Sequence, residues 1–132
     1  MSIPVDIDNL EKAIDKFGAT AYLITTDNEA HPHITHVTLS KDSDGFVCYL
    51  GRKTSANAAA RPSVAMLWPP MLPGEHSLIV DGLMQVTEIP ERGARGLFKP
   101  KAAILHRSAS GSEKETAGNC TSDCSPVITE RR

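Results

Sequence analysis

Four consecutive polar residues have the chemistry to bind an anion. Arg52, Lys53, Thr54 and Ser55 place two cations and two hydroxyl groups between an apolar run and an alanine-rich segment. Arginine can form paired hydrogen bonds with a phosphate, lysine supplies a point charge, and the first N–H groups of a following helix lack intrahelical partners. The pattern predicts a phosphate site. A solvated basic turn, with Ser55 as the N-cap of the helix, is the alternative interpretation.

Three histidines raise the question of a metal site, because imidazole is a common ligand. Along a strand, side chains alternate, so His31 and His33 share one face and His36 points to the other. No cysteine or carboxylate stands at a convincing ligand spacing, and we therefore expect structural or surface histidines and no metal. Cys120 and Cys124 could hold a metal or form a redox pair, but their weakly patterned surroundings favour an incidental pair.

The elements that must position these residues follow from the hydrophobic pattern. Apolar residues between positions 7 and 17 recur at helical spacing, with Asp8 as N-cap, Glu11 as its N3 partner and Gly18 just past the end. The alanine-rich segment 56–61 predicts a second short helix. Six segments have strand character: 19–26, 31–40, 46–50, 63–68, 77–89 (with a bulge or bend at Gly82) and 102–106. Short turns between them predict a small, mainly antiparallel barrel.

The composition is that of one globular domain. The chain has 132 residues, of which 40% are hydrophobic and 23% charged, and its net charge of -2 is too balanced for nonspecific nucleic-acid binding. With no apolar stretch of membrane-spanning length, no signal-peptide pattern and no disulfide framework, we expect a cytoplasmic protein without a membrane partner. The domain is placed at residues 1–107. Residues 108–132, with few large apolar side chains, are expected to form a disordered tail.

Four segments, in this order, resemble the flavin-binding split barrels of the pyridoxamine 5'-phosphate oxidase-like superfamily. They are Ala21–Asp27 with His31-Pro32-His33, Phe46–Pro62, Val64–Trp68 and Ser77–Gly82. The resemblance covers residues 19–107. It implies a six-stranded antiparallel split β-barrel with short flanking helices. It also implies a homodimer that binds FMN noncovalently at the interface between its subunits.

The resemblance implies a cofactor-binding role for eleven residues. Arg52 and Lys53 match the family's cationic pair on the flavin phosphate, Thr54 and Ser55 would add hydroxyl contacts, and Asn57 matches an asparagine one helical turn on. The other implied contacts belong to the strand along the isoalloxazine ring and to the start of a later strand: Thr35, His36, Val37, Thr38, His76 and Ser77. No catalytic side chain is implied, because the flavin itself performs the redox chemistry.

Two departures from the family pattern bear on function. The pair Arg52-Lys53 lies one residue further from Pro62 than the family pattern leads us to expect. Lys53-Thr54 is therefore the alternative equivalent of the family's cationic pair. Ile104 stands where the oxidases carry the arginine of an Arg-x-His element that holds the vitamin substrate. We therefore expect an FMN-dependent oxidoreductase of unknown small-molecule substrate. The alternatives are a deazaflavin-dependent reductase and a non-catalytic flavin- or haem-binding module.

Overall fold

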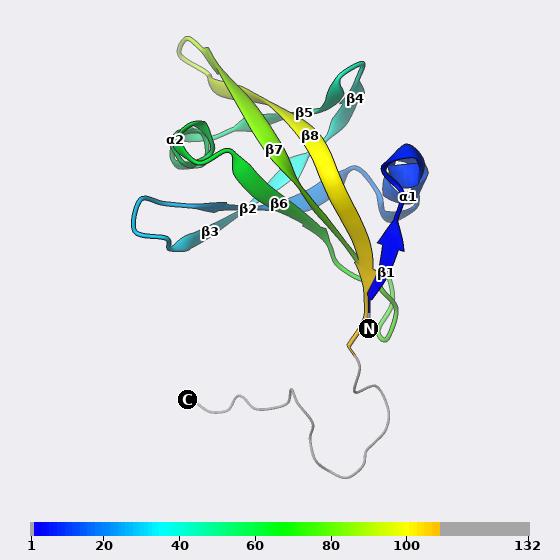
Figure 1. The fold of residues 1–132 in the computed structure, drawn as a ribbon. Coiled ribbons are helices and arrows are strands. Elements are labelled where there is room, and N and C mark those ends of the chain that lie inside the picture. Colours follow the sequence, from blue (N-terminus) through cyan, green and yellow to red (C-terminus); the bar gives the residue numbers. More distant parts are fainter. Residues whose placement is uncertain (1, 109–132) are drawn as a thin grey trace.

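A curled antiparallel sheet carries most of residues 2–108, which are the residues that the computed structural model describes (Figure 1). Its eight strands are β1 (Ser2–Val5), β2 (Thr20–Thr26), β3 (Pro32–Thr38), β4 (Ser40–Asp42), β5 (Gly45–Leu50), β6 (Ser63–Trp68), β7 (Ser77–Ile89) and β8 (Gly93–His106). A single 3-10 turn, η1 (Ile7–Asn9), leads into helix α1 (Leu10–Phe17), and helix α2 (Arg52–Ala60) connects β5 to β6.

The strand order makes this sheet a split barrel. Neighbouring strands follow the order β3-β2-β6-β7-β8-β5-β4, and β1 pairs with the last residues of β8, 103–106. The sheet curls until β3 contacts β5, although these two strands are not paired in the ladder. The long strands β7 and β8 pair along their whole length except for a register shift at Asp81/Gly82, which confirms the predicted irregularity. The predicted mainly β, antiparallel split-barrel class is confirmed.

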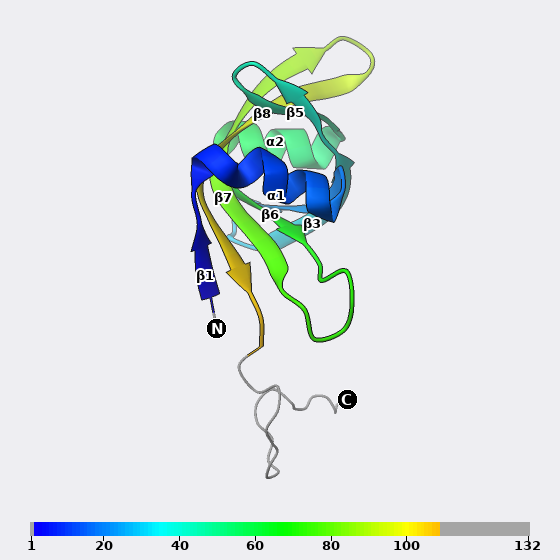
Figure 2. The same cartoon turned by 90° about the vertical axis from the view of Figure 1, so that its right-hand side faces the viewer.

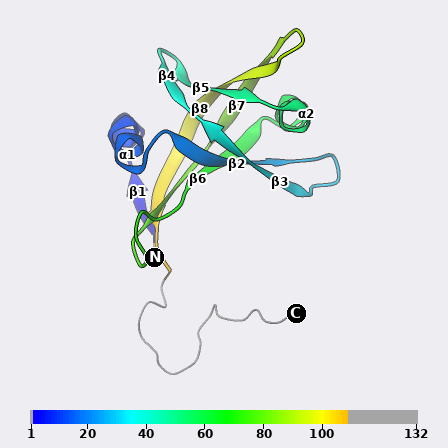
Figure 3. The same cartoon turned by 180° about the vertical axis from the view of Figure 1, so that it is seen from behind.

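The two helices lie at opposite ends of the curled sheet (Figures 1 and 3), and both pack against the core that it encloses. Helix α1 buries Leu10 and Ile14 in the core and ends at Gly18, whose φ of 104° is a conformation that favours glycine. The indole Nε1 of Trp68 donates a hydrogen bond to the Gly18 carbonyl at 2.9 Å. This bond ties the end of β6 to the end of α1.

Two additional strands and one earlier strand start distinguish the sheet from the expected six strands. β1 was not predicted, because four residues that include a proline carry no alternating pattern and pair only through the tertiary contact with β8. The segment 31–40 is divided into β3 and β4 at Leu39. The last strand begins at Gly93 rather than Ala102, because pairing with β5 and β7 overrides the low strand propensity of its glycines and proline.

The start of α1 also differs from the prediction. Asp8 lies inside η1, and the N-cap of α1 is Asn9, whose side chain makes no capping hydrogen bond. The predicted Asp8–Glu11 capping box is therefore wrong, although the helix end at Gly18 is confirmed. The predicted tail at 108–132, with Cys120 and Cys124, falls outside the described residues except for Ser108. No helix in the described part of the chain is long and apolar enough to cross a membrane.

Candidate functional site

The four polar residues singled out from the sequence form the first turn of α2. The helix begins at Arg52, with Gly51 as N-cap, rather than at Ala56 as predicted. The earlier start follows from packing: Thr54, Asn57 and Ala58 are buried at the three-and-four spacing that turns one helical face to the core. Sequence propensity misplaced the start, because serine is a preferred N-cap residue and Ser55 therefore predicted a helix that begins at Ala56.

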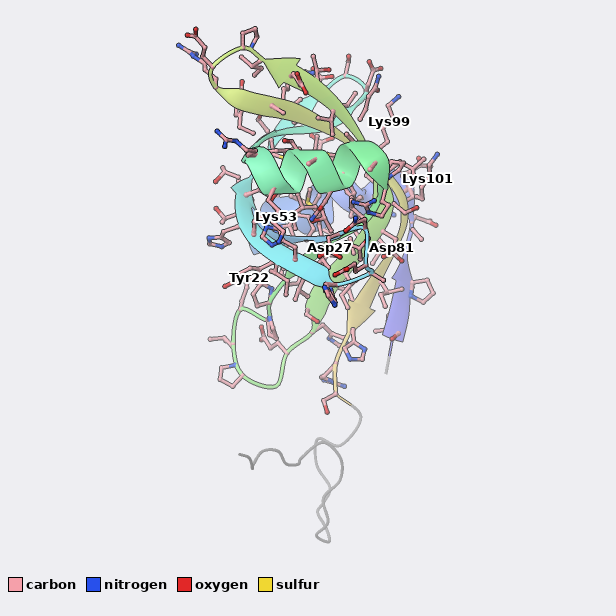
Figure 4. The ribbon with its side chains drawn as sticks, turned by 90° about the vertical axis from the view of Figure 1, so that its left-hand side faces the viewer. Tyr22, Asp27, Lys53, Asp81, Lys99 and Lys101 are labelled. Atoms are coloured by element: carbon pink, nitrogen blue, oxygen red, sulfur yellow. The ribbon has the colours of Figure 1, made fainter. Side chains whose placement is uncertain are left out.

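The first turn of α2 has the charge and the free donors to attract an anion. Arg52 and Lys53 are exposed, and neither has an ion-pair partner among residues 2–108. The turn contains no acidic residue and no side-chain cap, so the positive end of the helix dipole and its first N–H groups are not neutralised locally. In Figure 4, Lys53 lies at the end of α2 nearest to β3.

The remaining polar side chains of α2 hold the helix in place. Ser55 Oγ donates to the Arg52 carbonyl at 3.0 Å, so Ser55 is not the N-cap. The buried Asn57 Nδ2 donates to Thr25 Oγ1 on β2 at 3.1 Å. The Asn57–Thr25 bond ties α2 to β2, whereas the Ser55 bond lies within the helix.

A hollow of about 890 Å³ adjoins the first turn of α2. One wall is Gly51, Arg52 and Ser55, and the other is the turn between β7 and β8, residues 88–93. The charged residues of this second wall are Glu88, Glu91 and Arg92. Arg52 therefore faces both free space and a partly acidic wall.

The residues of β3 that were predicted to contact the cofactor lie on both faces of the strand. Val37 is buried in the core, and Thr35 lies on the same face, opposite the buried Leu23 of β2. Thr35 Oγ1 is itself buried and has no hydrogen-bond partner among residues 2–108. His36 and Thr38 point outward and are exposed. Because β3 ends the strand order, half of its backbone N–H and C=O groups lack a ladder partner.

Tyr22 is a neighbour of this strand that the sequence reading missed. Its ring stacks on His36 with a centroid distance of 4.7 Å and an interplanar angle of 27°. The pair lies directly across the β2–β3 hairpin, whose register also sets Thr26 opposite Pro32. The four-residue turn predicted at 27–30 would set Tyr22 opposite Thr35, so the pair with His36 follows only from the observed register, whose loop is one residue longer.

The outward face of the sheet is unusually apolar for an exposed surface. Two rows of directly paired residues cross it: Ile34, Ile24, Ala65, Asp81 and Ala102, and His36, Tyr22, Leu67, Ile79, Ile104 and Pro4. Ile34 is 60% exposed, and Tyr22 and Leu83 are nearly 40% exposed. Asp81 and Lys101 line a hollow of about 430 Å³ on this face (Figure 4).

His76 and Ser77 stand apart from the first turn of α2. Ser77 Oγ donates to the His106 carbonyl at 3.2 Å, at the end of β7 that pairs with the end of β8. His76 lines a hollow together with residues of α1. Since α1 and α2 lie at opposite ends of the curled sheet (Figure 1), one copy of the described chain does not bring His76 and Arg52 together.

The other candidate groups have structural surroundings. His31 Nδ1 lies 3.4 Å from an Asp27 carboxylate oxygen, at the exposed tip of the β2–β3 hairpin. Within residues 2–108, no three histidine, cysteine or acidic side chains gather as a metal site would require. Cys48 is buried, and this burial raises the pKa of its thiol to about 11, so it is not a reactive thiolate at neutral pH.

Comparison with known proteins places the chain among relatives. Uncharacterized proteins of Mycobacterium bovis (Mb0449c) and Mycobacterium tuberculosis (MT0457) are each 35% identical to it, in an alignment that covers 91% of this chain and 92% of each relative. The chain belongs to their family. No family model matches the sequence.

Solved structures share the fold at much lower identity. A putative pyridoxamine 5'-phosphate oxidase from Listeria innocua matches with a TM-score of 0.62 at 15% identity, over 78% of this chain and 100% of its own. The FAD-binding protein of Mycobacterium smegmatis matches with 0.60 at 13%, over 81% and 100%. The haem storage protein HutZ of Vibrio cholerae matches with 0.60 at 13%, over 74% and 94%. The fold is that of the pyridoxamine 5'-phosphate oxidase-like split barrels.

The residues present suit a phosphate-bearing cofactor. An exposed arginine and lysine on an uncapped helix start supply charge and N–H donors for a phosphate. The unpaired edge of β3 supplies backbone donors and acceptors for a polar ring edge. The solved neighbours include proteins named for FAD and for haem, so the fold alone does not select the cofactor.

Proposed function

We propose that this protein binds FMN through the first turn of α2 and acts as an FMN-dependent oxidoreductase on a small molecule. The observation that carries the proposal is the uncapped start of α2, which presents Arg52 and Lys53 without an acidic residue in the turn. A phosphate dianion there would receive charge-assisted hydrogen bonds from both side chains and N–H bonds from the first turn.

In this proposal the protein binds and orients the cofactor. Arg52 and Lys53 hold the phosphate, and free backbone groups of β3 between Thr35 and Thr38 take the polar edge of the ring. The hydrophobic residues of the outward face exclude water from the ring. When bound, the isoalloxazine supplies the hydride or electron transfer, and no protein side chain is required as an acid or a base.

We further propose that two copies associate through the outward face of the sheet. Its two apolar rows cross β3, β2, β6, β7 and β8, and an exposed patch of that extent on a small domain favours a partner. In such a dimer, Ser77 of the second copy would supply a contact that one copy does not bring to α2. Light scattering at micromolar concentration should give the mass of a dimer, and a monomer would contradict this part.

Turnover is the test of the enzymatic proposal. Purified protein is loaded with FMN, reduced by a nicotinamide nucleotide, and exposed to oxygen or a quinone over repeated cycles. We expect repeated bleaching and recovery of the flavin absorbance in step with donor consumption. A flavin that binds without cycling would reduce the function to that of a carrier. Haem uptake without flavin uptake, or preference for a deazaflavin, would contradict the cofactor assignment.

A further inference from the structure

A second hollow lies far from the first turn of α2. It has a volume of about 930 Å³ and is formed by one face of α1, the loop between β6 and β7, and the end of β8. Figure 2 shows α1 in front of the sheet, with this loop extending below it. The proposed function makes no use of α1.

One part of this hollow is apolar. Ala13 and Phe17 of α1 and Leu105 of β8 are half-buried in its wall, and Met71 of the loop is 52% exposed at its edge. These side chains come from three separate elements. They provide a surface on which an aliphatic or ring-shaped body could lose its hydration.

A polar atom in the same hollow lacks a partner. His76 Nε2 is buried from solvent and makes no hydrogen bond within the described chain. Buried polar groups are nearly always satisfied, and one that is not is destabilising until a ligand or water satisfies it. His76 precedes β7 and lines the hollow beside the loop, so a ligand in the hollow can reach its ring.

Cations outnumber carboxylates around the hollow. Lys12 and Lys16 stand one helical turn apart on the same face of α1, both exposed and without an ion-pair partner among the described residues. Arg107 adds a third cation, and the acidic groups are Asp15 and Glu75. The hollow therefore combines an apolar wall with an excess of positive charge.

From this combination, we propose that the hollow beneath α1 binds a small carboxylate with an apolar body. Lys12 and Lys16 take the carboxylate, and the wall around Phe17 and Leu105 covers the apolar body. A turn of the His76 ring, which lines the hollow, brings its unpaired Nε2 to the ligand as a directional hydrogen-bond partner. A neutral ligand of the same shape leaves the two ammonium groups unused. The site is separate from the first turn of α2, so it stands or falls independently of flavin binding.

The test uses octanoate and 1-octanol as matched probes on the full-length protein, followed by ¹H–¹⁵N NMR. We expect octanoate to shift the His76 imidazole signals and the amides of residues 12–17 and 71–76, and to bind more tightly than octanol. The double variant Lys12→Gln/Lys16→Gln changes two exposed side chains and should weaken octanoate binding about five-fold, with little effect on octanol. Lys99→Gln/Lys101→Gln, on β8, removes the same charge elsewhere and should leave both affinities unchanged.

Three results would overturn the proposal. They are equal affinity for the two probes, equal loss in the two double variants, and octanoate shifts confined to the outward sheet face around Tyr22 and Ile34. FMN uptake measured on the same variants keeps the two proposals apart. Loss of octanoate binding with normal FMN uptake in Lys12→Gln/Lys16→Gln would support the second site alone.

Discussion

The hydrogen bond between Asn57 and Thr25 links α2, the proposed cofactor helix, to β2. Its donor and acceptor atoms are 3.1 Å apart, and the two residues are 4% and 1% exposed. A neutral buried hydrogen bond contributes about 0.5–1.5 kcal/mol, and leaving one partner unsatisfied costs about 1–3 kcal/mol. Asn57→Ala and Thr25→Val should therefore each lower the free energy of unfolding by about 1–3 kcal/mol.

The double variant makes this prediction refutable. Because Asn57→Ala/Thr25→Val removes both polar groups together, its loss should fall short of the sum of the single losses by about 1 kcal/mol. Urea unfolding can be followed by the fluorescence of Trp68, the chain's one tryptophan, which is 1% exposed. Ser55→Ala is the control, because the Ser55 hydroxyl donates only to a carbonyl of its own helix. It should change the free energy of unfolding by less than about 0.5 kcal/mol. Strict additivity of the two core variants would show that the bond does not stabilise the fold.

Three further predictions concern the scaffold. Gly82→Ala should lower the free energy of unfolding by about 1–3 kcal/mol, because the new Cβ would lie 2.7 Å from the Phe98 ring. Gly51→Ala is the control: its new Cβ would meet no described atom within 4 Å, and the free energy of unfolding should fall by about 1 kcal/mol or less. Equal losses in the two variants would contradict the packing argument. In a variant whose only cysteine is Cys48, a thiol reagent at pH 8 should react only after unfolding, because burial raises the pKa to about 11; fast labelling of folded protein would refute this. The backbone N–H groups of His31 and Glu29 donate to the Asp27 carboxylate and hold its pKa below the ordinary 3.8. The stability that this carboxylate adds is therefore present above pH 3.8 and is lost as the pH falls through the lowered pKa. Asp27→Asn should flatten the fall of the unfolding free energy in acid, and parallel curves of unfolding free energy against pH for the two proteins would contradict this.

Local signals in the sequence were enough to predict the central part of the fold. The hairpin of β2 and β3, the end of α1 at Gly18 and the irregularity at Gly82 each follow from a turn, a glycine or a change of period. The early start of α2 and the full length of β8 did not follow. Both depend on burial and pairing with segments distant in sequence, which override weak local propensities.

The candidate site was predictable in composition but not in arrangement. The cationic pair Arg52-Lys53 was identified from residue types and spacing, and the structure sets it at an uncapped helix start. The separation of His76 from that pair could not be predicted from the sequence, because it depends on how the folded sheet sets α1 and α2 at its opposite ends (Figure 1). The alternation along β3, which turns Thr35 inward and His36 outward, depends on the pairing register.

The gain in flavin affinity that the phosphate provides is the measurement that tests the central claim most directly. FMN and riboflavin differ only in the phosphate, so their affinities are compared in the wild type and in Arg52→Ala/Lys53→Ala. We predict that the wild type binds FMN at least about ten-fold more tightly than riboflavin, and that the double variant loses most of this preference while its riboflavin affinity stays unchanged. An unchanged preference for FMN in the double variant would contradict the assignment of the first turn of α2 as the phosphate site.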